Sequence, residues 1–206
     1  MISSYVILAD GMFPTHPAPL DVLQHADTVV CCDGAASKLM QFGREPDFIV
    51  GDMDSLSPLL KERFADRLFS SPDQETNDLT KAVAFCKERH AKRITVLGAT
   101  GLREDHTLGN IALLSDYTPL FESIEMMTDY GIFTVMTESG HLSCHKGQQI
   151  SIFALNPEAR LSAEGLKYPI SNRTLSSWWQ GTLNEALGEC FSLCFSEGKW
   201  IVFRCY

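Results

Sequence analysis

The sequence lacks the features of a membrane protein and of a nucleic-acid-binding protein. No hydrophobic run is long enough to cross a bilayer, and the first apolar stretch ends at Asp10 without a basic segment before it. We therefore expect no signal peptide, no membrane anchor and no membrane partner. The 17 Lys and Arg residues are outnumbered by 26 Asp and Glu, for a formal net charge of -9. This charge disfavours a nucleic-acid partner, which needs a basic face.

Short cysteine motifs are also absent. The seven cysteines are an odd number, and no two of them have the C-x-x-C spacing of metal and redox sites. Most lie within apolar runs such as Val29–Cys32. We interpret them as reduced core residues, which predicts a reducing compartment and a cytoplasmic location.

The phosphate-binding loop G-x-x-x-x-G-K-[ST] is missing as well. Gly198 and Lys199 are followed by Trp200, so the chain is not a P-loop kinase. An acidic protein can still bind an anionic nucleotide when a metal ion supplies the local positive charge.

The patterns that are present predict two kinds of structure. With 206 residues, 45% of them hydrophobic, the chain can bury a large core. In the first half, short apolar runs alternate with helical patterns, which predicts a parallel sheet covered by helices. The expected strands are Tyr5–Ala9, Thr28–Cys32, Phe48–Val50, Leu68–Ser70, Ile94–Leu97 and Ile124–Met127. The expected helices are Asp21–His25, Ala35–Phe42, Pro58–Phe64, Asp78–Arg89 and Asp105–Ser115.

Glycines punctuate the second half, between short runs rich in β-forming residues. The expected strands there are Phe133–Met136, Gln149–Phe153, Phe191–Phe195 and Trp200–Cys205. Their spacing suits an antiparallel sandwich or a small barrel. We therefore predict an α/β N-terminal domain with a mostly parallel sheet over residues 1–127, followed by an all-β sandwich C-terminal domain over residues 128–206.

Acidic residues follow four of the expected parallel strands. They are Asp33, Asp52, Asp54, Asp73, Glu75, Asp78, Glu104 and Asp105. Because ligands of such sheets bind beyond the carboxyl ends of the strands, these side chains are expected at one edge. Clustered carboxylates repel unless a cation lies among them, and oxygen ligands without a Cys/His set favour Mg²⁺ over zinc. The sequence thus predicts a Mg²⁺-nucleotide site.

Simpler explanations exist for some of these residues. Asp33 with Gly34 is a common turn, and Asp78 and Asp105 could each only cap a helix. The Gly51–Ser55 segment is harder to explain in this way, because two aspartates one residue apart can share a cation. Arg103 beside Asp105 suits phosphate oxygens, whereas His106 alone is more often structural.

Several segments resemble the signature segments of thiamine pyrophosphokinases. Residues 49–55, 72–81 and 98–106 resemble the three segments of the α/β half, and Asp33-Gly34-Ala35 resembles the Asp-Gly-Gly of that family. Residues 165–170 and 181–185 resemble its Gly-Leu-Lys and Ser-Asn-Glu segments. The order and spacing agree across nearly the whole chain.

The resemblance implies an enzyme that transfers diphosphate from ATP to the hydroxyl of thiamine, giving thiamine diphosphate and AMP. It also implies a β-sandwich domain that serves thiamine binding and dimerisation, and a homodimer with active sites at the subunit interface. By position, Mg²⁺ would be held by Asp52, Asp54 and Asp78. ATP or its phosphates would be contacted by Asp33, Gln74, Arg103, Asp105 and His106. The thiamine pocket would include Thr182 and Asn184.

Three residues depart from the family pattern. Leu102 stands where a second glycine is usual, Asn77 replaces a threonine, and Leu183 replaces the serine before Asn184. The last change removes a hydroxyl from the expected thiamine pocket. A related diphosphokinase that acts on a pterin-type acceptor therefore remains an alternative function. Two further functions stay open as well, namely a metal-dependent phosphohydrolase and a non-catalytic sensor of a nucleotide or of thiamine diphosphate.

Two assignments within the site are also open. Either Asp105 or Asp78 could accept the proton of the attacking hydroxyl. An aromatic face for cationic thiamine could come from Trp178, Trp179 or Trp200, although burial in the core is the usual position for tryptophan.

Overall fold

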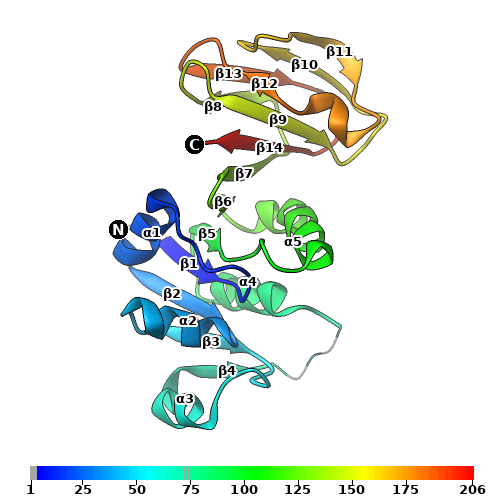
Figure 1. The fold of residues 1–206 in the computed structure, drawn as a ribbon. Helices are drawn as coiled ribbons and strands as arrows, with labels where there is room; N and C mark the ends of the chain where they lie inside the picture. Colours follow the sequence, from blue (N-terminus) through cyan, green and yellow to red (C-terminus); the bar gives the residue numbers. More distant parts are fainter. Residues whose placement is uncertain (1–3, 72, 74) are drawn as a thin grey trace. The chain divides into compact units, whose positions relative to one another are not determined.

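The computed structural model describes residues 4–71, 73 and 75–206, which form two compact units that divide after Asp129 (Figure 1). The first unit combines a parallel sheet with helices, and the second is an antiparallel β-sandwich. The predicted fold class is therefore confirmed. In the part of the chain that the structure describes, no helix is both long and apolar enough to cross a membrane.

The first unit is built on six parallel strands in the order β6-β5-β1-β2-β3-β4. Their bounds are β1 Ser4–Leu8, β2 Thr28–Cys32, β3 Phe48–Gly51, β4 Leu68–Ser70, β5 Arg93–Leu97 and β6 Ser123–Met127. The central strands are apolar along their length, as expected for a sheet that is covered on both faces. In β2, for example, Val29–Cys32 is fully buried.

Helices connect these strands. Their bounds are α1 Pro17–His25, α2 Ala35–Phe42, α3 Pro58–Arg63, α4 Asp78–Glu88 and α5 Glu104–Tyr117, with short 3₁₀ turns η1 Ala65–Arg67 and η2 Thr118–Leu120. Helix α4 contacts β1, β2 and β3 through an apolar face that includes Leu79, Ala82 and Val83. Asn77 caps this helix, since its Oδ1 accepts a hydrogen bond of 2.9 Å from the Thr80 N–H.

Helix α1 begins four residues earlier than predicted. The prediction placed its start at Asp21. The structure starts it at Pro17, where a missing N–H costs no helical hydrogen bond. His16 caps it through Nδ1, which accepts from the Ala18 N–H at 3.2 Å.

The second unit consists of two antiparallel layers. One has the order β12-β9-β14-β7 and the other the order β11-β10-β13-β8. The bounds are β7 Gly131–Met136, β8 Gly140–Ser143, β9 Gln149–Ala154, β10 Arg160–Glu164, β11 Ile170–Thr174, β12 Asn184–Glu185, β13 Cys190–Cys194 and β14 Trp200–Cys205, with a 3₁₀ turn η3 at Trp178–Gly181. Trp200 is fully buried in the core of this unit.

Two expectations about side chains need correction. Cys31, Cys32 and Cys86 are buried, but Cys190 and Cys194 are exposed, because they point outward from β13. All seven cysteines, each within the described residues, are free. Trp178 and Trp179 are also exposed, the latter at 74%, because they lie in a surface turn rather than in a strand.

Candidate functional site

The parallel sheet of the first unit has a topological switch point. Strand β1 lies between β2 and β5, so the strand order reverses there, which is where ligands bind in open α/β sheets. A cavity of about 460 Å³ lies beyond the carboxyl ends of these strands. Its walls are formed by Ala9, Asp10, Gly11, Cys32, Asp52, Asp73, Thr76, Asn77, Asp78, Leu79, Lys81, Ala99, Thr100, Leu102, Arg103, His106, Thr107 and Asn110.

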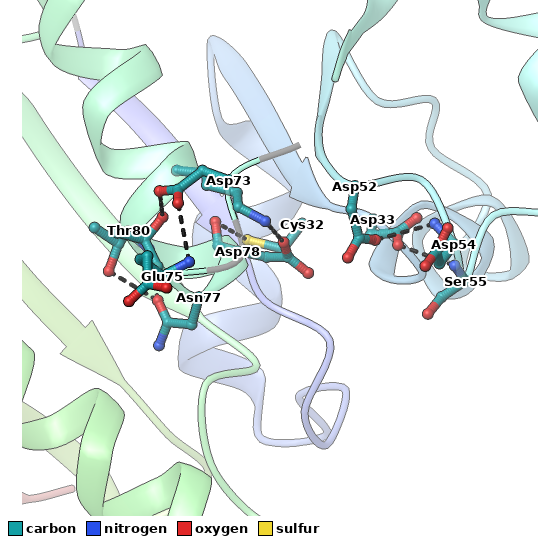
Figure 2. A network of polar contacts seen from close by, with 12 residues as sticks. Cys32, Asp33, Asp52, Asp54, Ser55, Asp73, Glu75, Asn77, Asp78 and Thr80 are labelled. Atoms are coloured by element: carbon teal, nitrogen blue, oxygen red, sulfur yellow. Dashed lines mark hydrogen bonds and ion pairs between the residues drawn. The ribbon is translucent and has the colours of Figure 1, made fainter. Parts of the chain in front are cut away.

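Three carboxylates from three different elements meet beside this cavity. Asp33 follows β2, Asp52 follows β3, and Asp78 begins α4, yet one oxygen of each lies within 4.8 Å of the other two (Figure 2). The structure brings together Asp52 and Asp78, as their positions after β3 and at the start of α4 predicted. The structure also brings Asp33 to the same place, although that residue was expected to contact ATP.

Asp33 is the most constrained member of this carboxylate group. It is only 3% exposed, and its backbone has a positive φ of 34°. Its Oδ2 accepts from the Ser55 N–H at 3.0 Å, whereas no donor among the described residues reaches its buried Oδ1. Burial raises the pKa of Asp33, and the charges of Asp78 and Asp52 add to the effect.

Gly51 leaves room for the approach of Asp33 and Asp78, and Gly34 leaves room for the neighbouring Asp10. A Cβ at Gly51 would lie 3.0 Å from the Cβ of Asp33 and 3.4 Å from the carboxyl carbon of Asp78. A Cβ at Gly34 would lie 2.5 Å from a carboxylate oxygen of Asp10. Side chains at these positions would therefore push the acidic residues apart.

Asp54 lies outside the carboxylate group. It is exposed, and its N–H donates to Oδ1 of Asp52 at 3.1 Å. This hydrogen bond lowers the pKa of Asp52, which is therefore ionised next to Asp33. On the other side of the group, Oδ1 of Asp78 pairs with Nζ of Lys81 at 3.1 Å.

This arrangement fits a divalent cation. The carboxylates of Asp33, Asp52 and Asp78 lie close together. The buried Oδ1 of Asp33 has no hydrogen-bond donor among the described residues, so this oxygen requires a proton or a cation. All three ligands are hard oxygen donors, and the neighbouring cavity leaves room for water and phosphate oxygens, as Mg²⁺ prefers.

Two of the predicted phosphate-contacting residues, Arg103 and His106, line the cavity. Arg103 pairs with Asp105 through two hydrogen bonds of 3.1 and 2.6 Å, and both side chains are largely exposed. The pair lowers the pKa of Asp105. His106 lines the cavity, and its N–H donates to Asp105 at 2.8 Å. Gln74 lies outside the described residues.

Two residues at this cavity, Asp10 and Asn110, were not predicted from the sequence. Asp10 follows β1, and the same strand-end argument would have found it had the first strand been included. Its carboxylate pairs with Lys38 at 2.7 Å. Asn110 donates to the carbonyl of Ala99 at 2.8 Å and accepts from Asn77 at 3.2 Å, which ties the α4 cap to the loop after β5. No pattern in the sequence indicated that link.

The predicted thiamine-pocket residues lie in the second unit, each with a local partner. Asn184 is 6% exposed, and its side chain binds both the N–H and the carbonyl of Tyr168, at 3.0 and 2.7 Å. It therefore positions that segment. The Thr182 hydroxyl donates to the Trp179 carbonyl at 2.8 Å. Leu183 is 70% exposed and has a φ of 59°, which is unusual for a leucine.

A parallel sheet with a carboxylate group and an arginine around a cavity at its switch point is typical of enzymes that transfer phosphoryl groups. The family model for the catalytic domain of thiamin pyrophosphokinase matches residues 20–128, and the model for its substrate-binding domain matches residues 131–203. The chain belongs to the thiamin pyrophosphokinase family.

Individual relatives agree with this membership. Thiamine pyrophosphokinase 3 of Oryza sativa subsp. japonica is 30% identical over 182 residues, which cover 73% of this chain and 67% of the relative. Thiamine pyrophosphokinase 1 of the same plant is 29% identical over 178 residues, covering 71% and 67%. The crystal structure of thiamin pyrophosphokinase from Geobacillus thermodenitrificans has the same fold, with a TM-score of 0.83 at 24% identity over 98% of this chain and 97% of that one.

Proposed function

We propose that this protein is a thiamine diphosphokinase, which transfers a diphosphate from ATP to the hydroxyl of thiamine and releases AMP. The observation that carries the proposal is the convergence of Asp33, Asp52 and Asp78 beside one cavity, which Asp52 and Asp78 line. Membership of the family supports both substrates. A phosphohydrolase, a pterin-specific enzyme and a sensor have no comparable support.

The nucleotide half of the reaction belongs to the first unit. We propose that Asp52 and Asp78 hold Mg²⁺ together with Asp33, and that Asp54 reaches the same ion. The bound ion neutralises the charge of the triphosphate. Arg103 binds phosphate oxygens, since a guanidinium matches them in geometry and charge. The loop after β5, which Asn110 braces, positions Arg103 and His106 beside the nucleotide.

The acceptor half belongs to the second unit. We propose that thiamine binds at the surface formed by Thr182 and by the segment that Asn184 positions. We also propose a homodimer with its active sites at the subunit interface, and a cytoplasmic location. Asp78 and Asp105 remain the two candidates for accepting the hydroxyl proton, and each holds an ion pair in the free protein.

The identity of the products tests this proposal. With ATP, thiamine and Mg²⁺, the purified protein is expected to release AMP and thiamine diphosphate in equal amounts. ADP with thiamine monophosphate would contradict diphosphate transfer, and nucleotide cleavage without thiamine would indicate a phosphohydrolase. Turnover of a pterin alcohol instead of thiamine would reassign the acceptor. Binding of nucleotide without any turnover would indicate a sensor.

A further inference from the structure

Lys81 is a buried cation in the wall of the cavity. It is 8% exposed and is the only buried lysine or arginine among the residues that the structure describes. It lies one turn into α4, three residues after Asp78, and lines the same cavity as Asp52 and Asp73. The resemblance to thiamine pyrophosphokinases assigned it no function.

Helix stability does not explain this position. Burying an ammonium group costs desolvation energy. An ion pair between residues three positions apart stabilises a helix equally well on its exposed face, where that cost does not arise. A positive charge near the amino-terminal end of a helix also opposes the helix dipole. The position of Lys81 instead matches the charge of the cavity, because Lys81 pairs with Asp78 and its positive charge also helps to lower the pKa of Asp52 and of Asp73.

The hydrogen bonds of Lys81 show where an anionic ligand can bind. Nζ donates one hydrogen bond within the described residues, to Oδ1 of Asp78 at 3.1 Å. An ammonium has three N–H donors, so two remain for a ligand in the cavity. In the free protein, Lys81 is thus a counter-ion beside carboxylates that a divalent cation would otherwise neutralise.

We propose that Lys81 binds a phosphate group of the nucleotide, and that it exchanges its hydrogen bond with Asp78 in the free site for one with a phosphate oxygen in the complex. This inference rests on the proposed function, because it needs a polyphosphate in the cavity. It makes Lys81 a substrate-binding residue and also a competitor of divalent cations for Asp78.

Two binding measurements on Lys81→Met test the proposal. Calorimetry with Mg²⁺-ATP, without thiamine, is expected to show an affinity lower by about tenfold or more, as for the loss of a charge-assisted hydrogen bond. Titration with Mn²⁺ alone is expected to show an affinity higher by about threefold or more, because a nearby positive charge is gone. The matched control is Lys87→Met, which removes an exposed charge from the same helix and is expected to change neither affinity.

The opposite shifts of the two affinities distinguish this role from a structural one. Lys81→Arg keeps the charge and is expected to retain most of the Mg²⁺-ATP affinity. If a folded Lys81→Met protein binds both probes like the wild type, or binds both more weakly, the proposal is wrong. It is also wrong if neither variant folds, since Lys81 is then structural. Failure of the wild type to bind Mg²⁺-ATP would instead contradict the proposed function.

Discussion

At the scale of the residue, Asp33 shows how the carboxylate group combines burial with charge. Burial and its charged neighbours raise its pKa, and its Oδ1 has no donor among the described residues. Asp54, by contrast, is exposed and contributes a backbone N–H to Asp52. Both residues were predicted at the carboxyl ends of parallel strands, with Asp54 expected to bind the metal and Asp33 to contact ATP, but in the structure Asp33 is the one that joins the carboxylate group.

Replacing the predicted metal ligands tests this site. Asp52→Asn and Asp54→Asn are each expected to reduce turnover by about 100-fold or more at ordinary Mg²⁺ concentrations, because each removes a charge that the cation needs. Steady-state kinetics measures the effect, and circular dichroism checks the fold. Asp66→Asn, an exposed position away from the cavity, is the control. Near-normal turnover of both variants would show that Asp52 and Asp54 only form a turn.

At the scale of the element, one carboxylate fixes the segment between β1 and α1. Asp129, which follows β6, accepts hydrogen bonds from the backbone N–H groups of Thr15 and His16, at 2.8 and 3.0 Å. It also accepts from the Thr15 hydroxyl. Burial opposes ionisation of Asp129, but these hydrogen bonds outweigh it and lower its pKa. The segment that they hold begins with Asp10 and Gly11, which line the cavity.

Asp129→Ala is expected to loosen this segment in a pH-dependent way. A carboxylate with a lowered pKa stabilises the fold above its unfolded pKa, about 3.9, and loses that effect as the pH falls through its folded pKa. At neutral pH we expect the free energy of local opening to fall by about 1 kcal/mol. The expected change is modest because water screens the charge of a half-exposed carboxylate. Hydrogen exchange of peptides from α1 measures the opening.

The difference between wild type and Asp129→Ala is therefore expected at neutral pH and should shrink below about pH 4. Asp27→Ala, at an exposed position just after the same helix, controls for loss of a negative charge. An equal difference at both pH values would mean that packing, rather than the ionised carboxylate, holds the segment.

At the scale of the whole molecule, the proposed site residues are divided between the two units. The candidate nucleotide and metal residues lie in the first unit, whereas Thr182 and Asn184 lie in the second. If the active site is completed across a two-fold interface, each copy supplies a different half of it.

Mixing two inactive variants tests this division. Asp52→Asn and Thr182→Val subunits are expected to form heterodimers with one intact site each, and activity is expected to recover to roughly a quarter of the wild-type value after random exchange. Thr182 is preferable to Asn184, whose buried hydrogen bonds hold the Tyr168 segment. Native mass spectrometry verifies the exchange. If Thr182→Val is active by itself, Thr182 is not part of the active site. If heterodimers form but activity does not recover, the active site is not shared between subunits.

The sequence by itself determined the fold class and the order of the elements in the first unit. Strong apolar patterns predicted β2, β4, α2 and β14 with the bounds that the structure shows. The sequence missed β8, β10, β11 and β12, because these strands are short or largely exposed and carry little apolar pattern. Strand β11, for example, has a single buried residue, Ile170.

The tertiary structure alone decided which carboxylates meet. Their positions after the strands predicted Asp33, Asp52, Asp54 and Asp78 at one edge of the sheet, but local sequence does not determine which of their carboxylates come into contact. That choice depends on the strand order, on the missing Cβ of Gly51 and on the backbone turn at Asp33. The burial of Lys81 beside Asp78 was also decided by the tertiary structure. Local sequence patterns predict which face of a helix is apolar, whereas packing between elements decides which charged side chains lose contact with water.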